Sequence, residues 1–151
     1  MSNLLLLRRR GMMAAAKQVI TLYKSDFSYG RGADYNYPYN SNYPQRISYI
    51  PFDIRIDNVG AWHFELDTNY STAQIALHFF TQNVLSLVAA HSSIQGKYLD
   101  TGWKATSFNY NVPATYQSSP IVGFRITIRQ STSNPVISSN FTINSFIARK
   151  L

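Results

Sequence analysis

The sequence predicts an all-β protein: an antiparallel β-sandwich, jelly-roll-like, preceded by a short N-terminal arm or helix. Three observations support this class. Short runs of alternating apolar and polar residues recur along the chain, and turn-forming residues separate them. Only 14% of the 151 residues are charged, and Ser, Thr, Asn, Gln and Tyr replace the missing charge. Strands do not alternate with helices, so a doubly wound nucleotide-binding fold is not expected.

Residues 1–17 form a separate segment that we interpret as a docking arm. Four leucines, Leu4, Leu5, Leu6 and Leu7, precede three arginines, Arg8, Arg9 and Arg10. A secretory signal has the opposite polarity, and the apolar run is too short to span a membrane. Gly11 interrupts the helix-forming residues, so we expect the arm to order only against a partner or the body. The alternative is a disordered terminus.

Residues 18–151 are expected to be a single β-sandwich domain, which begins with a strand at 18–24. A Tyr/Asn-rich loop follows at 29–46, where Gly and Pro exclude a regular helix or a central strand. Exposed rings in such a loop can stack on sugars or fill a neighbour's grooves. The candidate glycan or partner contacts are Tyr35, Tyr37, Tyr39, Tyr43 and Trp103. The alternative is that the tyrosine rings only hold the loop to its own sandwich.

The remaining chain predicts further strands, for a total of about eight. Pro51 weakens a candidate at 47–56, which suits an edge or a bend. The alternation slips by one residue near Asn144 and Ser145, which predicts a bulge. The other expected strands are 59–67, 74–80, 83–90, one or two within 97–110, 122–129 and 140–148.

The same alternation predicts which side chains form the core. His63, Glu65 and Asp67 should point outward. Arg125 should lie on a solvent face, so that its replacement by Ala costs little in the monomer. The residues expected inward are Trp62, Phe64, Leu66, Val122, Phe124, Ile126 and Ile128.

The candidate chemistry predicts a protein that is not an enzyme and uses no metal or cofactor. The chain has no cysteine, and His63, His78 and His91 lack the close pairing of a jelly-roll metal site. Its seven acidic residues form no clear catalytic pair, and no serine lies in a Gly-x-Ser-x-Gly turn. Four of the 14 basic residues lie in the first 17, and the rest are scattered, which does not favour direct nucleic-acid binding.

The segment from Ser2 to Lys17 resembles the N-termini of structural proteins from tailed phages of Bacteroidetes hosts, including crAss-like phages. Those proteins often begin with a few apolar residues, a run of arginines and then methionines, as here in Leu4–Leu7, Arg8–Arg10 and Met12–Met13. The resemblance implies a virion component, such as a head auxiliary, head-fibre or tail protein. The polar strands also resemble small virion jelly rolls, which is an analogy of fold only.

These observations lead to an expected function, a non-enzymatic virion protein that forms homo-oligomers and binds other virion proteins through its arm. The four leucines would fill an apolar groove, and the three arginines would pair with acidic side chains or with packaged nucleic acid. One alternative is a carbohydrate-binding module or receptor-binding lectin that uses the Tyr-rich loop. Another is a coat-type protein whose arm touches nucleic acid, with salt-dependent affinity.

Overall fold

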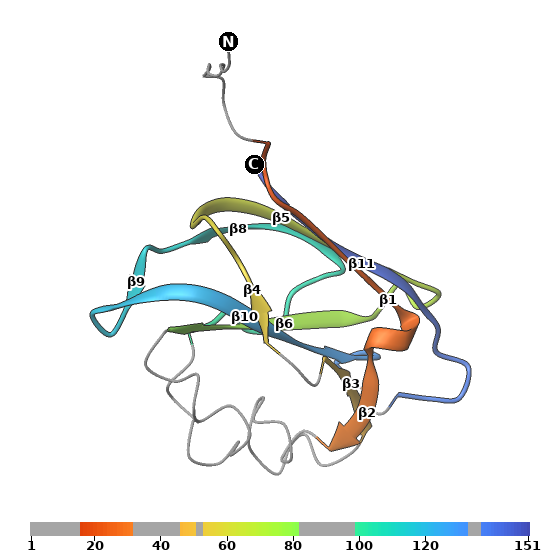
Figure 1. Ribbon diagram of the computed structural model, residues 1–151. Helices are drawn as coiled ribbons and strands as arrows, with labels where there is room; N and C mark the ends of the chain where they lie inside the picture. The colour runs from red at the N-terminus through yellow and green to blue at the C-terminus, as the bar shows by residue number, and fades with distance from the viewer. Residues whose placement is uncertain (1–15, 32–45, 51–52, 82–98, 133–136) are drawn as a thin grey trace.

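The computed structural model describes residues 16–31, 46–50, 53–81, 99–132 and 137–151, with backbone alone at 29–31 and 46–49. Two antiparallel sheets pack face to face, as Figure 1 shows. The chain is therefore an all-β sandwich, as the sequence predicts. Residues 1–15 of the docking arm, the four candidate tyrosines of the 29–46 loop and the expected strand at 83–90 lie outside the described residues.

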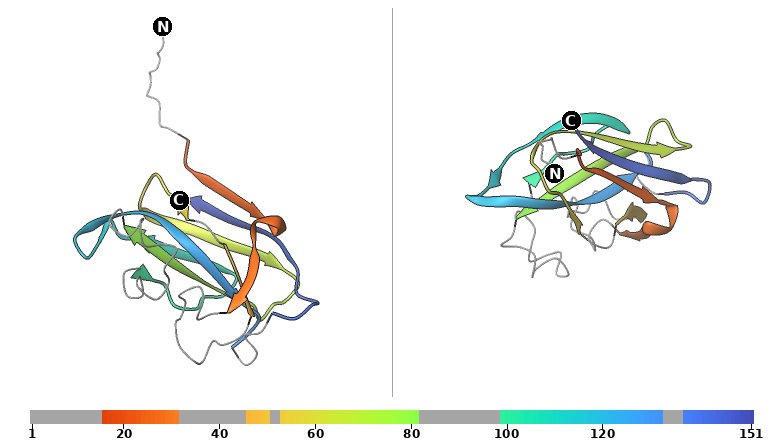
Figure 2. Two further views of the ribbon diagram at one scale, coloured as in Figure 1. Left: turned by 60° about the horizontal axis from the view of Figure 1, so that its bottom comes forward. Right: turned by 45° about the horizontal axis from the view of Figure 1, so that its top comes forward.

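The smaller sheet has four strands in the order β1, β11, β5 and β8. Each pair is antiparallel, and β1 runs along β11 at one margin of the sheet (Figure 2). The strands are β1 (Val19–Tyr23), β11 (Ile143–Lys150), β5 (Gly60–Thr68) and β8 (Ser107–Val112). A short 3-10 turn, η1 (Lys24–Asp26), follows β1.

The larger sheet has seven strands, five of them in the order β2, β3, β10, β6 and β7. Two more short strands, β4 and β9, also pair with β10. The seven are β2 (Ser28–Arg31), β3 (Arg46–Tyr49), β4 (Ile54–Arg55), β6 (Gln74–Thr81), β7 (Leu99–Asp100), β9 (Thr115–Tyr116) and β10 (Ser119–Arg129).

The strand order is that of a jelly roll. With the edge strand β2 and the short β4 and β9 set aside, the main strands are numbered one to eight along the chain. The smaller sheet then has the order 1-8-3-6 and the larger sheet the order 2-7-4-5. This interleaving is the double-sheet arrangement of jelly rolls, in which the first and last strands are neighbours.

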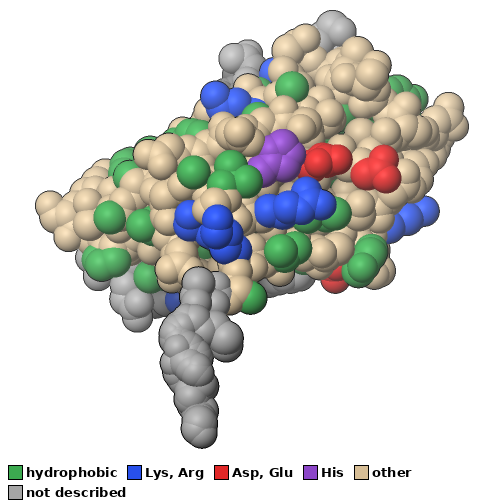
Figure 3. Space-filling view, turned by 90° about the horizontal axis from the view of Figure 1, so that it is seen from above, with side chains coloured by type: hydrophobic (Ala, Val, Ile, Leu, Met, Phe, Trp, Pro, Cys, Tyr) green, Lys and Arg blue, Asp and Glu red, His purple; other side chains and the backbone are tan. Residues whose placement is uncertain are grey.

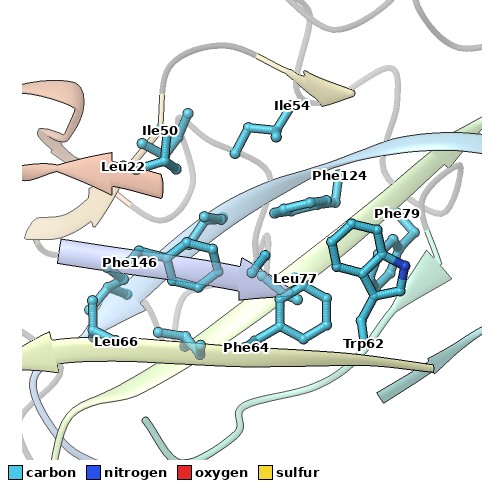
Figure 4. Close-up of a cluster of buried hydrophobic side chains, with 14 of the residues drawn as sticks. Leu22, Ile50, Ile54, Trp62, Phe64, Leu66, Leu77, Phe79, Phe124 and Phe146 are labelled. Atoms are coloured by element: carbon cyan, nitrogen blue, oxygen red, sulfur yellow. The ribbon is translucent and has the colours of Figure 1, made fainter. Parts of the chain in front are cut away.

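The core lies between the two sheets and is centred on aromatic rings (Figure 4). The ring of Phe64 on β5 lies 5.7 Å from that of Phe124 on β10 and 6.3 Å from that of Phe146 on β11. It is also 6.1 Å from the Trp62 ring. Because Phe64 touches rings from both sheets, it joins the two layers. Strand β5 alternates as predicted: Trp62, Phe64 and Leu66 are buried, while Glu65 and Asp67 are exposed and His63 is partly exposed.

Strand β10 departs from the prediction at two places. The pairing with β6 shifts register between Ile121 and Gly123, so Val122 is bulged and only partly buried. Ile121 takes the expected inward place of Val122, because a bulge moves the alternation by one residue. Phe124, Ile126 and Ile128 are buried as predicted.

The second departure is the placement of Arg125, which the alternation assigns to a solvent face. Arg125 is only 8% exposed, and the neighbouring outward residues Thr127 and Arg129 are buried as well. Both faces of β10 are therefore buried. The prediction that Arg125 points to solvent was wrong, because alternation distinguishes polar from apolar faces and does not tell whether a polar face is covered.

Two further boundaries differ from expectation. The candidate strand at 47–56 is two short strands, β3 and β4, which pair with different parts of β10. β3 lies between β2 and β10, so it is not an edge strand. Tyr29 belongs to β2 and pairs with Ser48, so the ends of the expected 29–46 loop are strand.

The expected bulge near Asn144 and Ser145 is confirmed by a register shift between Ile143 and Ser145.

Candidate functional site

The outer face of the larger sheet carries a row of polar side chains, most of them buried. The pairing of β7, β6 and β10 places Asp100, His78 and Arg125 side by side on the face away from the core; His78 and Arg125 are buried, and Asp100 at the end of the row is exposed. Arg125 Nε donates a hydrogen bond to Asp53 Oδ1 at 3.2 Å, and both side chains are largely buried. The row therefore contains a buried ion pair next to a buried imidazole.

Burial determines the protonation of this row. It lowers the pKa of His78 well below its ordinary value, and the positive charge of Arg125 lowers that pKa further. His78 is therefore neutral at pH 7, and its Nε2 lies 3.5 Å from Thr127 Oγ1. Burial also raises the pKa of Asp53, although the guanidinium of Arg125 opposes the shift. The pair has the properties of a structural ion pair.

A second row on the same face surrounds Arg129. Its Nε and Nη2 both donate to Gln74 Oε1, at 2.9 and 2.6 Å. The guanidinium carbon also lies 4.4 Å from the centre of the Trp103 ring, which is a cation–π distance. Trp103, expected as a glycan or partner contact, is thus partly buried and packs against Arg129.

The outer face of the smaller sheet is exposed and polar. The register aligns Arg149 of β11 with His63 of β5 and Asn109 of β8. His63 Nδ1 lies 2.6 Å from Asn109 Oδ1, and Glu65 Oε1 lies 3.4 Å from His63 Nε2. Figure 3 views the molecule from this side, where a histidine, acidic groups and basic groups gather near the middle.

The polar group around His63 has part of the geometry of a catalytic triad. Ser107 Oγ lies 3.4 Å from His63 Nε2, while Asn109 occupies the other ring nitrogen. Acyl transfer also needs donors for the developing oxyanion. Ser107 is an exposed residue of β8. The hydrogen-bond ladder between β8 and β5 engages backbone groups next to it. The described contact of Ser107 is this single hydrogen bond to His63, and we build no catalytic step on it.

The exposed face also gives no metal centre in the part of the chain that the structure describes. No three His, Cys, Asp or Glu residues gather there in a way that could hold an ion. Likewise, no described helix has the length and apolar character to cross a membrane.

The chain meets the arm at Gln18, a residue that the sequence did not single out. Gln18 Oε1 accepts a hydrogen bond from Asp57 N at 2.8 Å, and its Nε2 donates to Arg55 O at 3.3 Å. Its carbonyl oxygen accepts from Lys150 N at 2.9 Å. Gln18 thus ties the start of β1 to both the β4 segment and the C-terminal strand. No local pattern could predict these partners, because they lie far away in sequence.

Comparison of the chain with protein-family models, with curated proteins and with solved structures finds no match. The functional interpretation therefore depends on the residues and geometry of this chain.

Proposed function

We propose that this protein is a non-enzymatic structural component of a phage virion, such as a head auxiliary, head-fibre or tail protein. It forms homo-oligomers and docks onto other virion proteins through residues 1–17. The virion context comes from the resemblance of the arm. The jelly roll is compatible with it, since viral capsid domains use this fold, although lectins do so too.

The observation that carries the docking role is the anchor at Gln18. A docking arm transmits binding to the body only if the junction is fixed. Three hydrogen bonds hold Gln18 to Arg55, Asp57 and Lys150. The arginines of the body support the docking role of the arm indirectly. The described contacts of Arg125 and Arg129 are internal to the body.

The arm itself supplies apolar area and charge. Burial of the four leucines contributes roughly 1.5–3 kcal/mol each, before the cost of ordering the chain. Ordering the arm removes much of that gain, so a single arm binds weakly. In an assembly that already positions many arms, binding becomes strong.

The test is incorporation of variants into the particle. Deletion of residues 1–10 should leave the melting temperature of the body unchanged and abolish incorporation, because Gln18 and β1 are retained. Replacement of Arg8, Arg9 and Arg10 by Gln should weaken incorporation less, and mostly at low salt if the partner is an acidic protein, because high salt already screens the charges of the unmodified arm. Normal incorporation of the truncated chain would overturn the proposal.

The carbohydrate-binding alternative finds little support in the described residues. Trp103 is the one candidate contact that the structure describes, and Arg129 packs against its ring. Clean binding on a glycan array that is lost on Tyr35→Ala, Tyr37→Ala or Tyr39→Ala would favour this alternative over the docking role.

A further inference from the structure

We infer that the outer edge of β1 pairs antiparallel with β1 of a second copy of this chain. The smaller sheets of the two copies then form one continuous sheet. The inference goes beyond the proposed function, because the interface belongs to the folded body and does not use residues 1–10.

The first observation is the position of β1. It lies at the margin of the smaller sheet and pairs with β11 on one side; no other described strand pairs with it. A strand edge of this kind presents unpaired N–H and C=O groups, which are a template for another strand.

The backbone of β1 shows which groups face outward. Lys150 N donates to Gln18 O, so Gln18 and Lys150 form a hydrogen-bonded pair. Such pairs recur at every second residue of an antiparallel ladder, so Ile20 and Leu22 also turn their backbone groups toward β11. The backbone groups of Val19, Thr21 and Tyr23 therefore point away from the sheet.

The second observation is the chemistry of this edge. Val19 and Tyr23 are 59% and 60% exposed, and they are two of the three exposed large hydrophobic residues of the described chain. No charged residue or proline occurs in β1 (Val19–Tyr23), although natural edge strands usually carry such residues to prevent pairing. The opposite edge strand, β8, exposes Ser107, Asn109 and Asn111 instead.

The third observation is that β1 is complementary to itself. With Thr21 on the two-fold axis, Val19 lies opposite Tyr23 of the partner subunit, on the exposed face. A β-branched residue opposite an aromatic residue is a favourable cross-strand pair. Thr21 N–H can then donate to Thr21 C=O of the partner subunit, and Val19 N–H to Tyr23 C=O of the partner subunit.

The contact has a limited length, because the Tyr23 N–H is already used. It donates to Asp26 Oδ2 at 2.8 Å, so it is not available to a neighbouring strand. A contact of about five residues per copy is smaller than a standard protein interface. The dimer should therefore be weak and concentration-dependent.

Sedimentation velocity of the full chain over a dilution series tests the interface. Thr21→Lys places two like charges opposite each other on the two-fold axis, and its exposed position should leave the fold intact. We expect the unmodified chain to dimerise with rising concentration, and Thr21→Lys to lose this dimer while it keeps its melting temperature. The matched control, Asn111→Lys on the opposite edge, should dimerise normally. A Thr21→Lys variant that dimerises like the unmodified chain would overturn the inference.

Cross-linking of the full chain tests the register independently. The protein has no cysteine, so Thr21→Cys introduces a single thiol. The two copies of residue 21 should have Cα atoms about 5.5 Å apart, within the range for a disulfide. Val19→Cys is the control, since each Val19 lies opposite Tyr23 of the partner subunit. We expect a disulfide-linked dimer on a denaturing gel for Thr21→Cys alone; equal cross-linking of both variants, or of neither, would contradict the register.

A chain that lacks residues 1–10 separates the two proposals. It should still dimerise through β1, even though the proposed function predicts that it no longer joins the particle. Loss of the dimer in this truncated chain would contradict the β1 interface and leave the docking role in place.

Discussion

Arg125 and Arg149 carry the same charge in opposite surroundings. Arg125 donates to Asp53 at 3.2 Å, and the two side chains are only 10% and 13% exposed. Arg149 lies 3.9 Å from Glu65, and both of those side chains are about half exposed. An isolated buried charge costs far more than an exposed one, because water no longer solvates it. The two arginines therefore form a matched pair for testing the buried row.

Arg125→Ala should lower the free energy of unfolding by about 3 kcal/mol, because Asp53 loses its partner in a buried site. Arg149→Ala should lower it by less than about 1 kcal/mol, since water screens exposed pairs. Urea unfolding of both variants measures the difference. Equal losses would show that Arg125 is not held in a buried pair.

His78 predicts how stability depends on pH. Its folded-state pKa lies well below the ordinary 6.5. As the pH falls through this value, His78 therefore binds a proton in the unfolded chain and stays neutral in the folded chain. Stability should therefore decrease from about pH 6.5 downward, by up to about 1.4 kcal/mol per pH unit. The raised pKa of Asp53 acts in the opposite direction and nearer pH 4, where its carboxylate loses its charge.

Urea midpoints at several pH values between about 8 and about 5, the range in which an ordinary histidine titrates, measure this dependence. His78→Gln should reduce the slope, while His63→Gln on the exposed face serves as the control. An unchanged slope in His78→Gln would mean that another group controls the acid sensitivity.

At the scale of elements, the close approach of β4 and β10 depends on Gly123. A Cβ atom there would clash with the backbone oxygen of Ile54 and with the ring of Phe80. The backbone of Ile54 is fixed by its pairing with Phe124, so it cannot move aside without cost.

Gly123→Ala should therefore destabilise the protein by about 1–3 kcal/mol, as overpacking does in a dense core. Thermal unfolding measures this, with Val122→Ala at the bulged, partly buried position as a control for the same strand. If Gly123→Ala were as stable as the unmodified chain, β4 would not pack on β10 as described.

The strands that the sequence predicted well are those with a long, uninterrupted alternation. Strand β5 has this pattern; in β11 the alternation is interrupted once, near Asn144, and that slip predicted the bulge. The bulge at Val122 left no such signal, because Ile121 and Val122 are both apolar. β4 has only two residues and pairs with a distant strand, so its place depends on contacts that local patterns do not carry.

At the scale of the whole molecule, composition and alternation predicted the sandwich but not the site. The buried polar cluster needs Asp53, His78 and Arg125 from three segments that only the sheet topology brings together. The anchor of Gln18 to Arg55, Asp57 and Lys150 is equally long-range. The docking role of the arm, in contrast, is inferred from the sequence.

The docking arm and the β1 edge predict two levels of association. On these proposals, the β1 edge would give a dimer of the folded body. The arm would add contacts beyond this dimer, because four leucines next to three arginines favour association once many copies are close together.

The most direct test of the docking role is the mass of the purified protein in solution, with and without residues 1–10. Light scattering at matched concentrations, above those at which the β1 dimer forms, should show species larger than a dimer for the full chain and none larger than a dimer for the truncated chain. Both chains should melt at similar temperatures, since β1 and its anchor are retained. If the two chains form the same largest species, the arm plays no part in assembly, and the proposed virion role loses its main support.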